Sequence, residues 1–292
     1  MNLQAYLSKN KKVIDRALDK FLPEARSSYI AKVMRYSVFA GGKRFRPALM
    51  LLVCEALSGK VKQVLAAACA VELIHTFTLI HDDLPCMDDD DYRRGKLTSH
   101  KKFGEDMATL AGDAMQALAY EILLKETKGV SLQYKMRALE TILEAIGSDG
   151  VVTGQVLDIQ SEGKKISLSA LENIHLKKTA ALIQAAVKAA AILCGASTKK
   201  ITQLDRYAQH LGLSFQIADD LLDYTSSFAK MGKQPGSDKK QKKSTYVSLL
   251  GKEKARQLMV KERDQTRRAI SFLGKKGKRL AELADFVIKR ER

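Results

Sequence analysis

Residues 204–223 read LDRYAQHLGLSFQIADDLLD. Their apolar side chains recur at intervals of three and four residues, from Leu204 through Leu211 to Leu222, which is the period of an amphipathic α-helix. The same spacing runs through most of the 292 residues, and only four prolines interrupt it. Ala, Leu, Lys and Glu fill the long segments between them, a composition that favours helices. The sequence therefore predicts an all-α fold of about ten helices.

No fixed-period repeat and no long polar linker divides the chain, so we expect a single domain over residues 1–292. A capping box at residues 169–172 predicts a helix that starts there and continues to about Cys194. Two segments break the helical pattern. Residues 226–244, rich in lysine and containing glycine and proline, are expected to form a loop or lid, and residues 274–279 a short basic hinge.

Three acids close the 204–223 stretch, namely Asp219, Asp220 and Asp223. On a helix they project from about one turn on one side, and Gln216 shares their stripe. A solvated helix face is the simplest interpretation. It is weakened because apolar residues surround the acids, as they would at the wall of a pocket.

A longer acidic cluster, DDLPCMDDDD, occupies residues 82–91. The preceding helical pattern ends here because Pro85 disfavours its continuation, so Asp82 and Asp83 lie on the last turn. The following loop is expected to bring Asp88 back toward them. Negative charge at a helix C-terminus opposes the macrodipole and costs stability unless a cation binds. An EF-hand calcium loop is excluded by its ligand spacing, so the two acidic clusters predict the two halves of one divalent metal site.

The chain carries 50 Lys and Arg against 33 Asp and Glu, a formal charge of +17, so we expect anionic partners. Charge alone does not distinguish nucleic acid, an anionic membrane surface and small polyphosphates. Arg93 and Arg94 directly follow the longer acidic cluster. This mixture of signs suits Mg²⁺ ions that bridge protein carboxylates to a phosphate-bearing substrate.

Further cations and one histidine could reach the same anion. Lys43, Arg44 and Arg46 follow a glycine pair where a helix begins, and backbone N–H groups can also face an anion there. His75 lies seven residues before Asp82, nearly two helical turns, and so shares its face. His75 could contact the substrate or be a satisfied core histidine, and the sequence leaves both open.

The sequence contains no serine, cysteine or histidine arrangement typical of an activated nucleophile, and no Walker-type glycine loop. The chemistry is therefore expected to rest on metal and substrate. A diphosphate neutralised by Mg²⁺, Lys and Arg becomes a good leaving group. The expected reaction is ionisation at a carbon–diphosphate bond.

Cellular location is inferred from three features. Cys54, Cys69, Cys86 and Cys194 lack the paired spacing of zinc or redox sites, which favours free thiols in a reducing cytosol. The N-terminal residues lack the apolar run of a signal peptide. Polar and charged residues interrupt the most apolar stretches, so we predict no membrane span and a cytoplasmic protein.

Five segments resemble the (E)-prenyl diphosphate synthases, and most closely the bacterial farnesyl diphosphate synthases. They are GGKRFRP at 41–47, LIHDDLPCMDDDDYRRG at 79–95, KT at 178–179, FQIADDLLD at 215–223 and KSTY at 243–246. In this order and spacing they are highly specific, and the resemblance covers nearly the whole chain. It implies a helical bundle around a deep central cavity, usually as a homodimer.

The resemblance also implies roles for individual residues. Three Mg²⁺ ions would be held by Asp82, Asp83, Asp88, Asp219 and Asp223. The diphosphate of an allylic substrate would contact Arg93, Lys178, Lys233 and Lys243, while Thr179 and Gln216 would face the reacting carbons and stabilise the allylic cation. Isopentenyl diphosphate would be held by Lys43, Arg46, His75 and Arg94. Its double bond attacks the cation and the released diphosphate takes the proton, giving (2E,6E)-farnesyl diphosphate from dimethylallyl and then geranyl diphosphate.

Product length is expected to depend on the residues just before the first aspartate. The family limits it by bulky side chains four and five residues earlier, here Thr78 and Phe77. Helical geometry places Thr78 close to the helix face that carries Asp82 and places Phe77 on a different face. The choice of Phe77 as the main residue that limits product length therefore rests on the resemblance. An aromatic residue there is similar to the bacterial farnesyl pattern, and a geranyl or geranylgeranyl product is the alternative.

Other classes of protein explain fewer of these features. A His-Asp metal phosphohydrolase would use His81 and Asp82 but needs further histidines around the metal. A nucleic-acid-binding protein would explain the charge, but the lysines are dispersed, Trp is absent and aromatics are 6%, so we expect no nucleic-acid partner. A terpene cyclase binds no isopentenyl diphosphate, so it would not explain the presence of Lys43, Arg46 and His75.

Overall fold

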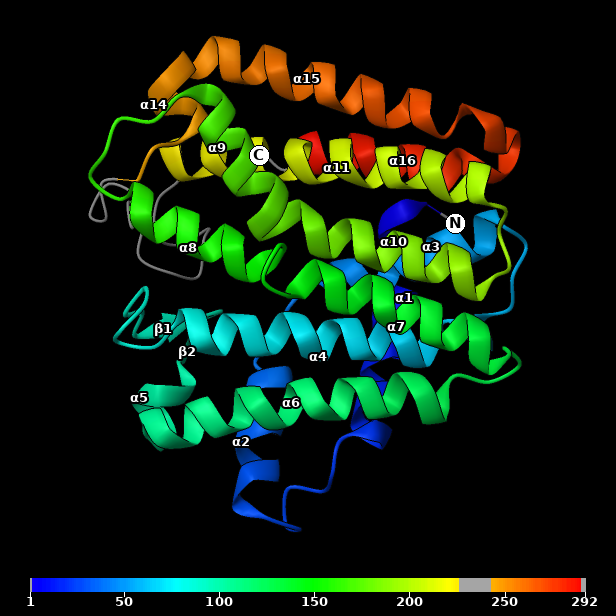
Figure 1. Ribbon diagram of the computed structural model, residues 1–292, viewed down its shortest axis with the longest axis vertical. Coiled ribbons are helices and arrows are strands. Elements are labelled where there is room, and N and C mark those ends of the chain that lie inside the picture. Colours follow the sequence, from blue (N-terminus) through cyan, green and yellow to red (C-terminus); the bar gives the residue numbers. More distant parts are fainter. Residues whose placement is uncertain (1, 226–242, 290–292) are drawn as a thin grey trace.

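The computed structural model of the chain describes residues 2–225 and 243–289. Within these residues the strands are β1 (Tyr92–Arg93) and β2 (Lys96–Leu97), which form one antiparallel hairpin (Figure 1). All other regular elements are helices: α1 (Leu3–Phe21), α2 (Tyr29–Val38), α3 (Phe45–Ala56), η1 (Val61–Gln63), α4 (Leu65–Asp82), α5 (Ser99–Phe103), α6 (Glu105–Glu126), α7 (Leu132–Ile146), α8 (Val151–Ser161), α9 (Leu168–His175), η2 (Leu176–Ala180), α10 (Ala181–Leu193), α11 (Thr198–Thr225), α14 (Tyr246–Leu250), α15 (Lys252–Ala269), η3 (Ser271–Gly277) and α16 (Lys278–Ile288). The predicted all-α fold is confirmed.

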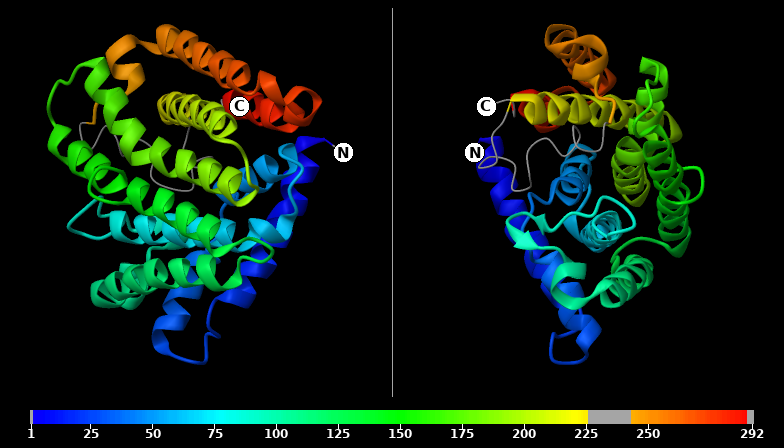
Figure 2. Two further views of the ribbon diagram at one scale, coloured as in Figure 1. Left: turned by 45° about the vertical axis from the view of Figure 1, so that its right-hand side comes forward. Right: turned by 90° about the vertical axis from the view of Figure 1, so that its left-hand side faces the viewer.

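Helices α4 and α10 form the centre of the bundle. Nearly every residue of α10 is buried, and α4 is buried from Ala66 to Ile74. Both helices are rich in alanine, whose small side chain lets neighbouring helix axes approach closely. Helices α3 and α6 pack against α4, α7 and α11 pack against α10, and α15 covers α11 on its outer side (Figures 1 and 2).

The two acidic clusters lie at the same end of this bundle. Helix α4 ends at Asp82, and α11 ends two residues beyond Asp223. Both ends lie on the left in Figure 1, beside the hairpin, the end of α8 and α14. The bundle therefore unites two clusters that are far apart in the sequence.

Helix α4 is long and apolar enough to cross a membrane by length and composition, and no other described helix is. However, 61% of its 18-residue window is buried inside the bundle. Core helices pass the same test, because both environments select apolar side chains. The predicted absence of a membrane span thus stays a prediction.

The helix expected from residues 169–172 begins slightly earlier than predicted. Ser167 has the extended backbone of an N-cap and its hydroxyl accepts from the backbone of α9, which starts at Leu168. Leu193 is the last residue of α10, and Gly195 follows its cap with a positive φ of 69°, so the predicted end is confirmed. Between α9 and α10 the helix widens into one π-turn, η2, which the sequence pattern did not predict.

Candidate active site

The longer acidic cluster closes α4. Asp82 is the last residue of the helix and Asp83 its C-cap. The Asp88 backbone N–H donates to the carbonyl oxygen of Asp82 at 2.8 Å, so the loop returns to the helix end as expected. Burial raises the pKa of Asp82 to about 6, although the nearby Lys178 lowers it. A desolvated carboxylate among other acids is stabilised by a bound cation.

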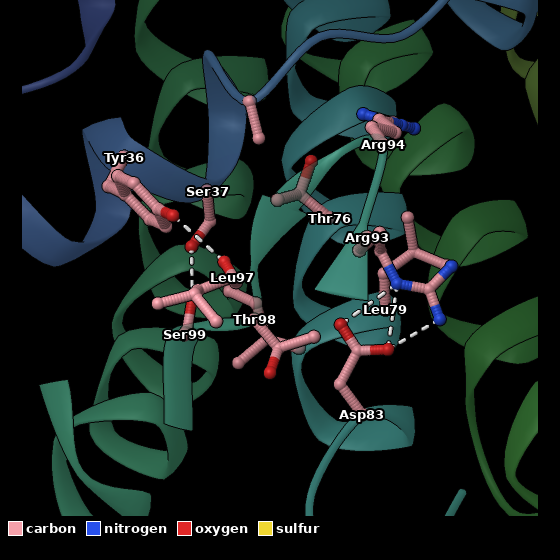
Figure 3. Close-up of a pocket in the computed structure, with 12 residues that line it drawn as sticks. Tyr36, Ser37, Thr76, Leu79, Asp83, Arg93, Arg94, Leu97, Thr98 and Ser99 are labelled. Carbon is pink, nitrogen blue, oxygen red and sulfur yellow. Dashed lines mark hydrogen bonds and ion pairs between the residues drawn. The ribbon is translucent and has the colours of Figure 1, made fainter. Parts of the chain in front are cut away.

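Asp83 is an ion-pair partner of Arg93. Asp83 is only 3% exposed, and its two carboxylate oxygens accept from Arg93 Nε at 2.7 and 2.8 Å (Figure 3). The hairpin that carries Arg93 is held on α2, because the Tyr36 hydroxyl donates to the carbonyl oxygen of Leu97 at 2.8 Å. These groups line a small cavity between α2, α4 and the hairpin. In this arrangement both Asp83 oxygens are engaged, and its role as a metal ligand stays a prediction.

Asp158 on α8 connects the same cluster to two lysines. Lys178 Nζ lies 2.6 Å from Asp158 Oδ2, and Lys243 Nζ lies 3.3 Å from that oxygen. Lys243 Nζ also lies 3.1 Å from Asp88 Oδ1. Burial would raise the pKa of Asp158, but Lys178 and Lys243 hold it below its ordinary value. Burial opposes the charge on Lys243, but Asp158 and Asp88 raise its pKa, so it remains an ammonium.

The π-turn η2 positions Lys178 and Thr179, and π-turns occur frequently at functional sites. Gly154 allows α8 to pack directly on this turn, since a Cβ there would lie 2.2 Å from the backbone nitrogen of Lys178. Asp158, one helical turn further along α8, is thereby brought to the lysine. Asp158 could not be identified from the sequence, because a glycine and an acid four residues apart indicate no partner by themselves.

Helix α11 meets the π-turn through Gln216. The Thr179 hydroxyl donates to Gln216 Oε1 at 3.2 Å, and Gln216 Nε2 donates to Asp220 Oδ1 at 3.0 Å. Asp220 Oδ2 accepts from the backbone N–H of Tyr246 at 2.8 Å. Asp223 Oδ1 is buried and has no hydrogen-bond partner among the described residues. The three acids of α11 therefore differ in their surroundings.

Arg46 and Arg94 form a second cationic group beside His75. Burial lowers the pKa of Arg46 to about 10, and its Nε is buried with no hydrogen-bond partner in the described part of the chain. Burial also holds the pKa of His75 well below its ordinary value, and Arg46 and Arg94 add to this shift. Arg94 Nη1 donates to the carbonyl oxygen of Gly41 at 2.7 Å, while Lys43 is exposed. A neutral imidazole beside two guanidinium groups suits an incoming anion.

Arg44 does not belong to this group, although it is one of the three cations of the basic run at residues 43–46. It is 2% exposed and adopts a left-handed backbone with φ 51°. Its guanidinium lies 2.9 Å from Glu72 and 2.8 Å from Asp15, and it donates to the carbonyl oxygen of Val38 at 2.7 Å. Arg44 therefore joins α1, the end of α2 and α4 inside the core.

The His81 ring faces α6 rather than the acids. Its Nε2 lies 3.2 Å from the carbonyl oxygen of Thr109, and the Phe77 ring packs edge-on at 5.8 Å. Gly112 makes room for it, since a Cβ there would lie 2.1 Å from His81 Nε2. The His81–Asp82 metal pair that a His-Asp phosphohydrolase needs is therefore not formed.

Within residues 2–225 and 243–289, no group of three acids, histidines or cysteines forms a complete metal site. Mg²⁺ nevertheless fits the donors present, because it is commonly bound by one or two carboxylates together with substrate phosphates and water. Asp82 has a raised pKa and Asp223 an unpartnered oxygen, and a cation would stabilise both. The predicted set of five metal ligands remains a prediction.

His175 is buried beside this site, and its burial should make the stability of the protein depend on pH. Its ring stacks on Tyr246 with centroids 5.3 Å apart, and burial lowers its pKa to about 4. The unfolded chain, with a histidine pKa near 6.5, takes up the proton first, so stability is lost as pH falls from about 6.5 towards 4. His175→Phe should reduce this loss by about 2–3 kcal/mol, measured as urea-unfolding free energies at several pH values. An unchanged pH dependence in the variant would contradict this assignment.

Most of the predicted side chains thus meet at one end of the bundle. Asp82 and Asp88 lie with Lys178 and Lys243, and the Thr179–Gln216 pair connects them to α11. The cationic group at Arg46 lies within electrostatic reach of Asp219. Lys233 lies outside the described residues.

Known proteins resemble this chain in sequence and in fold. The profile of the polyprenyl synthetase family matches residues 27–285. The chain is 43% identical to a geranylgeranyl diphosphate synthase of Cyanophora paradoxa, over 99% of this chain and 97% of that protein. It is 42% identical to a dimethylallyltranstransferase of Fischerella ambigua, over 99% of this chain and 84% of that protein. The crystal structure of an FPP/GFPP synthase from Zymomonas mobilis has a TM-score of 0.87 and 35% identity, covering 98% of this chain and 99% of that one.

The helical bundle matches the fold of the isoprenyl diphosphate synthases, a class of prenyltransferases. The chain belongs to the polyprenyl synthetase family. Its reaction is therefore a prenyl diphosphate condensation of isoprenoid biosynthesis.

Proposed function

We propose that the chain condenses isopentenyl diphosphate with dimethylallyl and then geranyl diphosphate to give farnesyl diphosphate. One observation carries the proposal. The site contains two separate cationic groups. Lys178 and Lys243 share Asp158, and Lys178 adjoins the Thr179–Gln216 pair. Arg46 and Arg94 lie beside His75, and Arg46 lies within electrostatic reach of Asp219. Two anionic substrates need two such groups, whereas a hydrolase needs one.

The allylic diphosphate would bind among Lys178, Lys243 and Arg93, which neutralise its charge. Asp82, Asp88, Asp219 and Asp223 would hold Mg²⁺, and bound Mg²⁺ would stabilise the diphosphate as a leaving group. Lys178 and Lys243 are already held in place by Asp158, so little reorganisation is needed when the anion arrives.

Isopentenyl diphosphate would bind at Arg46, Arg94 and Lys43, next to His75. His75 is neutral in its buried position and can donate one hydrogen bond without adding charge. Oxygen atoms of Thr179 and Gln216 would stabilise the allylic cation that forms when the carbon–diphosphate bond breaks. The isopentenyl double bond then attacks the cation, and the carbocation that results loses a proton to the released diphosphate, which forms the double bond of the product. The predicted lid and the role of Lys233 fall outside the described residues and stay predictions.

The experiment that tests the reaction uses radiolabelled isopentenyl diphosphate, geranyl diphosphate and Mg²⁺, followed by sizing of the products. We expect turnover that depends on both substrates and on Mg²⁺, with a C15 product. Release of inorganic phosphate from nucleotides without isopentenyl diphosphate would contradict the proposal.

Phe77 supports the C15 product. It is half-buried on the side of α4 that faces α6, where it packs on His81. By contrast, the Thr78 hydroxyl donates to the carbonyl oxygen of His75 at 2.9 Å within its own helix.

If Phe77 closes the predicted product cavity, Phe77→Ala should deepen that cavity and lengthen the product by at least one isoprene unit, measured by chromatography of the dephosphorylated alcohols. Phe272→Ala, at a half-buried core position in η3, should leave the product at C15. Unchanged output from Phe77→Ala would count against this residue as the cavity floor.

A geranylgeranyl product is the second candidate. It is favoured by the name of the relative in Cyanophora paradoxa, with which this chain aligns over almost its full length. Product sizing with wild-type protein and farnesyl diphosphate as the allylic substrate distinguishes the two candidates. Efficient extension of farnesyl diphosphate would favour the longer product.

We further propose a cytoplasmic homodimer. Exposed apolar side chains on α7 and α8 support a partner surface: Leu132, Leu143, Val152, Val156 and Ile159. Light scattering coupled to size exclusion would give the mass, and a monomer at micromolar concentration would contradict the proposal. Free cysteines, of which Cys54 and Cys69 are buried, are consistent with a reducing compartment.

A further inference from the structure

Asp220 has surroundings unlike those expected for a member of an acidic metal cluster. It is 5% exposed, and each of its carboxylate oxygens accepts a hydrogen bond from a neighbouring group. Oδ1 accepts from Gln216 Nε2 at 3.0 Å, and Oδ2 accepts from the backbone N–H of Tyr246 at 2.8 Å. One contact lies within α11, and the other connects α11 to the start of α14.

The first contact fixes which way the Gln216 amide points. A carboxylate can only accept, so it selects the NH₂ end of the amide and turns Oε1 toward Thr179. The Thr179 hydroxyl donates to that oxygen at 3.2 Å. Without Asp220 the two ends of the amide would be nearly equivalent, and Gln216 could present NH₂ to the reacting carbons instead. An NH₂ group there would repel a developing cation rather than stabilise it.

The second contact fixes the segment that carries Lys243. Tyr246 is fully buried, and its ring stacks on His175, so its backbone is held from two sides. Lys243 stands three residues earlier, with Nζ 3.1 Å from Asp88 and 3.3 Å from Asp158. The position of Tyr246 therefore limits where the Lys243 ammonium can reach.

We propose that Asp220 is a positioning residue for the condensation: it orients Gln216 toward Thr179 and anchors the Lys243 segment beside Asp88, and it does not serve as a metal ligand. This inference rests on the proposed function, since it assigns Thr179, Gln216 and Lys243 to the reacting substrate. Asp220, the middle acid of the α11 cluster, thus has a different role from Asp219 and Asp223, which are the proposed metal ligands.

Asp220→Asn tests the proposal with little change of shape. The amide keeps one acceptor but presents NH₂ at the other end, so it must oppose either Gln216 Nε2 or the Tyr246 N–H. We expect kcat/KM to fall roughly 10–100-fold, as is usual when a supporting hydrogen-bond partner is lost. The Mg²⁺ concentration for half-maximal activity should change less than about twofold, because no metal ligand is removed. Asp223→Asn is the matched control and should raise that Mg²⁺ concentration.

Double variants distinguish positioning from a general structural effect. If Asp220 acts through Lys243 and Gln216, the activity loss caused by Asp220→Asn should be smaller in the Lys243→Ala and in the Gln216→Leu background than in wild-type protein, because one of its two routes is already lost. Full additivity with both would overturn the proposal, as would an unchanged kcat/KM. A shift in Mg²⁺ dependence equal to that of Asp223→Asn would identify Asp220 as a metal ligand.

A measurement without substrates separates failure of this inference from failure of the proposed function. Hydrogen–deuterium exchange of the peptide that contains Tyr246 should be faster in Asp220→Asn than in wild-type protein, because its amide loses an acceptor. Equal exchange would overturn the anchoring role even if wild-type turnover is confirmed. Absence of wild-type turnover with isoprenoid diphosphates would instead contradict the proposed function and leave the exchange result to decide whether Asp220 anchors α14.

Discussion

Asp82→Asn should remove most of the turnover and at the same time make the metal-free protein more stable. The loss of activity should be about 10²–10³-fold, since the carboxylate would hold the cation that stabilises the leaving diphosphate. The gain in stability follows from burial, which raises the pKa of Asp82 to about 6. At pH 8 the carboxylate is charged at an energetic cost in the folded state, and the amide is not.

The sign of this effect depends on pH in a defined way. Folding raises the pKa of the Asp82 carboxyl, so this group stabilises the folded state below its pKa in the unfolded chain, which is near 4. That stabilisation is lost as pH rises through the folded-state pKa of about 6. Asp82→Asn should therefore exceed wild-type stability by up to about 3 kcal/mol at pH 8, with little gain near pH 4. Urea unfolding in EDTA at the two pH values measures this difference.

The control for Asp82→Asn comes from the same acidic cluster. The Asp91 side chain is 56% exposed and lies 2.9 Å from Lys101. Asp91→Asn should keep turnover within about twofold of wild type, because an exposed pair contributes little. Full activity in Asp82→Asn, or a loss of metal-free stability at pH 8, would contradict the assignment of Asp82.

The general arrangement could be predicted from the sequence because it depends on periodicity. Apolar spacing identified the helices, and the acidic clusters marked the ends of α4 and α11, which the bundle brings together. The π-turn η2 is different, because an apolar spacing of three and four residues does not distinguish one widened turn from an ordinary α-helical turn. In the structure, Gly154 packs closely on this turn at Lys178.

Roles that depend on a partner could not be predicted from the sequence. Asp158 acts through Lys178 and Lys243, which are 20 and 85 residues further along the chain. Arg44 and Arg46 belong to the same basic run, and their roles differ only through the fold. Arg44 is paired with acids in the core, whereas Arg46 has an Nε without a hydrogen-bond partner among the described residues. Residue type and spacing thus identified charged groups, while packing decided which of them are structural.

Arg44→Met should destabilise the protein by about 3–5 kcal/mol, the usual result of removing one partner from a buried ion pair. Arg44 and Glu72 are 2% and 2% exposed, and their charged atoms lie 2.9 Å apart. Without the guanidinium, Glu72 must either keep a buried charge that has lost its hydrogen-bonded partner or take up a proton. Urea unfolding at pH 7 measures the loss. The exposed pair Lys125–Glu121 on α6 provides the control, and Glu121→Ala should cost less than about 1 kcal/mol.

The double variant Arg44→Met/Glu72→Met distinguishes an electrostatic cause from a loss of packing. If the cost in Arg44→Met arises from the stranded carboxylate, replacing Glu72 as well should restore much of the stability, because two apolar side chains fill similar volume without charge. If the cost arises from lost contacts of the arginine stem, the second substitution should add to the first. Asp15 keeps its ion pair with Lys11 in both variants, so it does not disturb the comparison. Recovery in the double variant, with isopentenyl diphosphate turnover retained, would show that Arg44 serves the fold and that the substrate cations are the remaining members of its run.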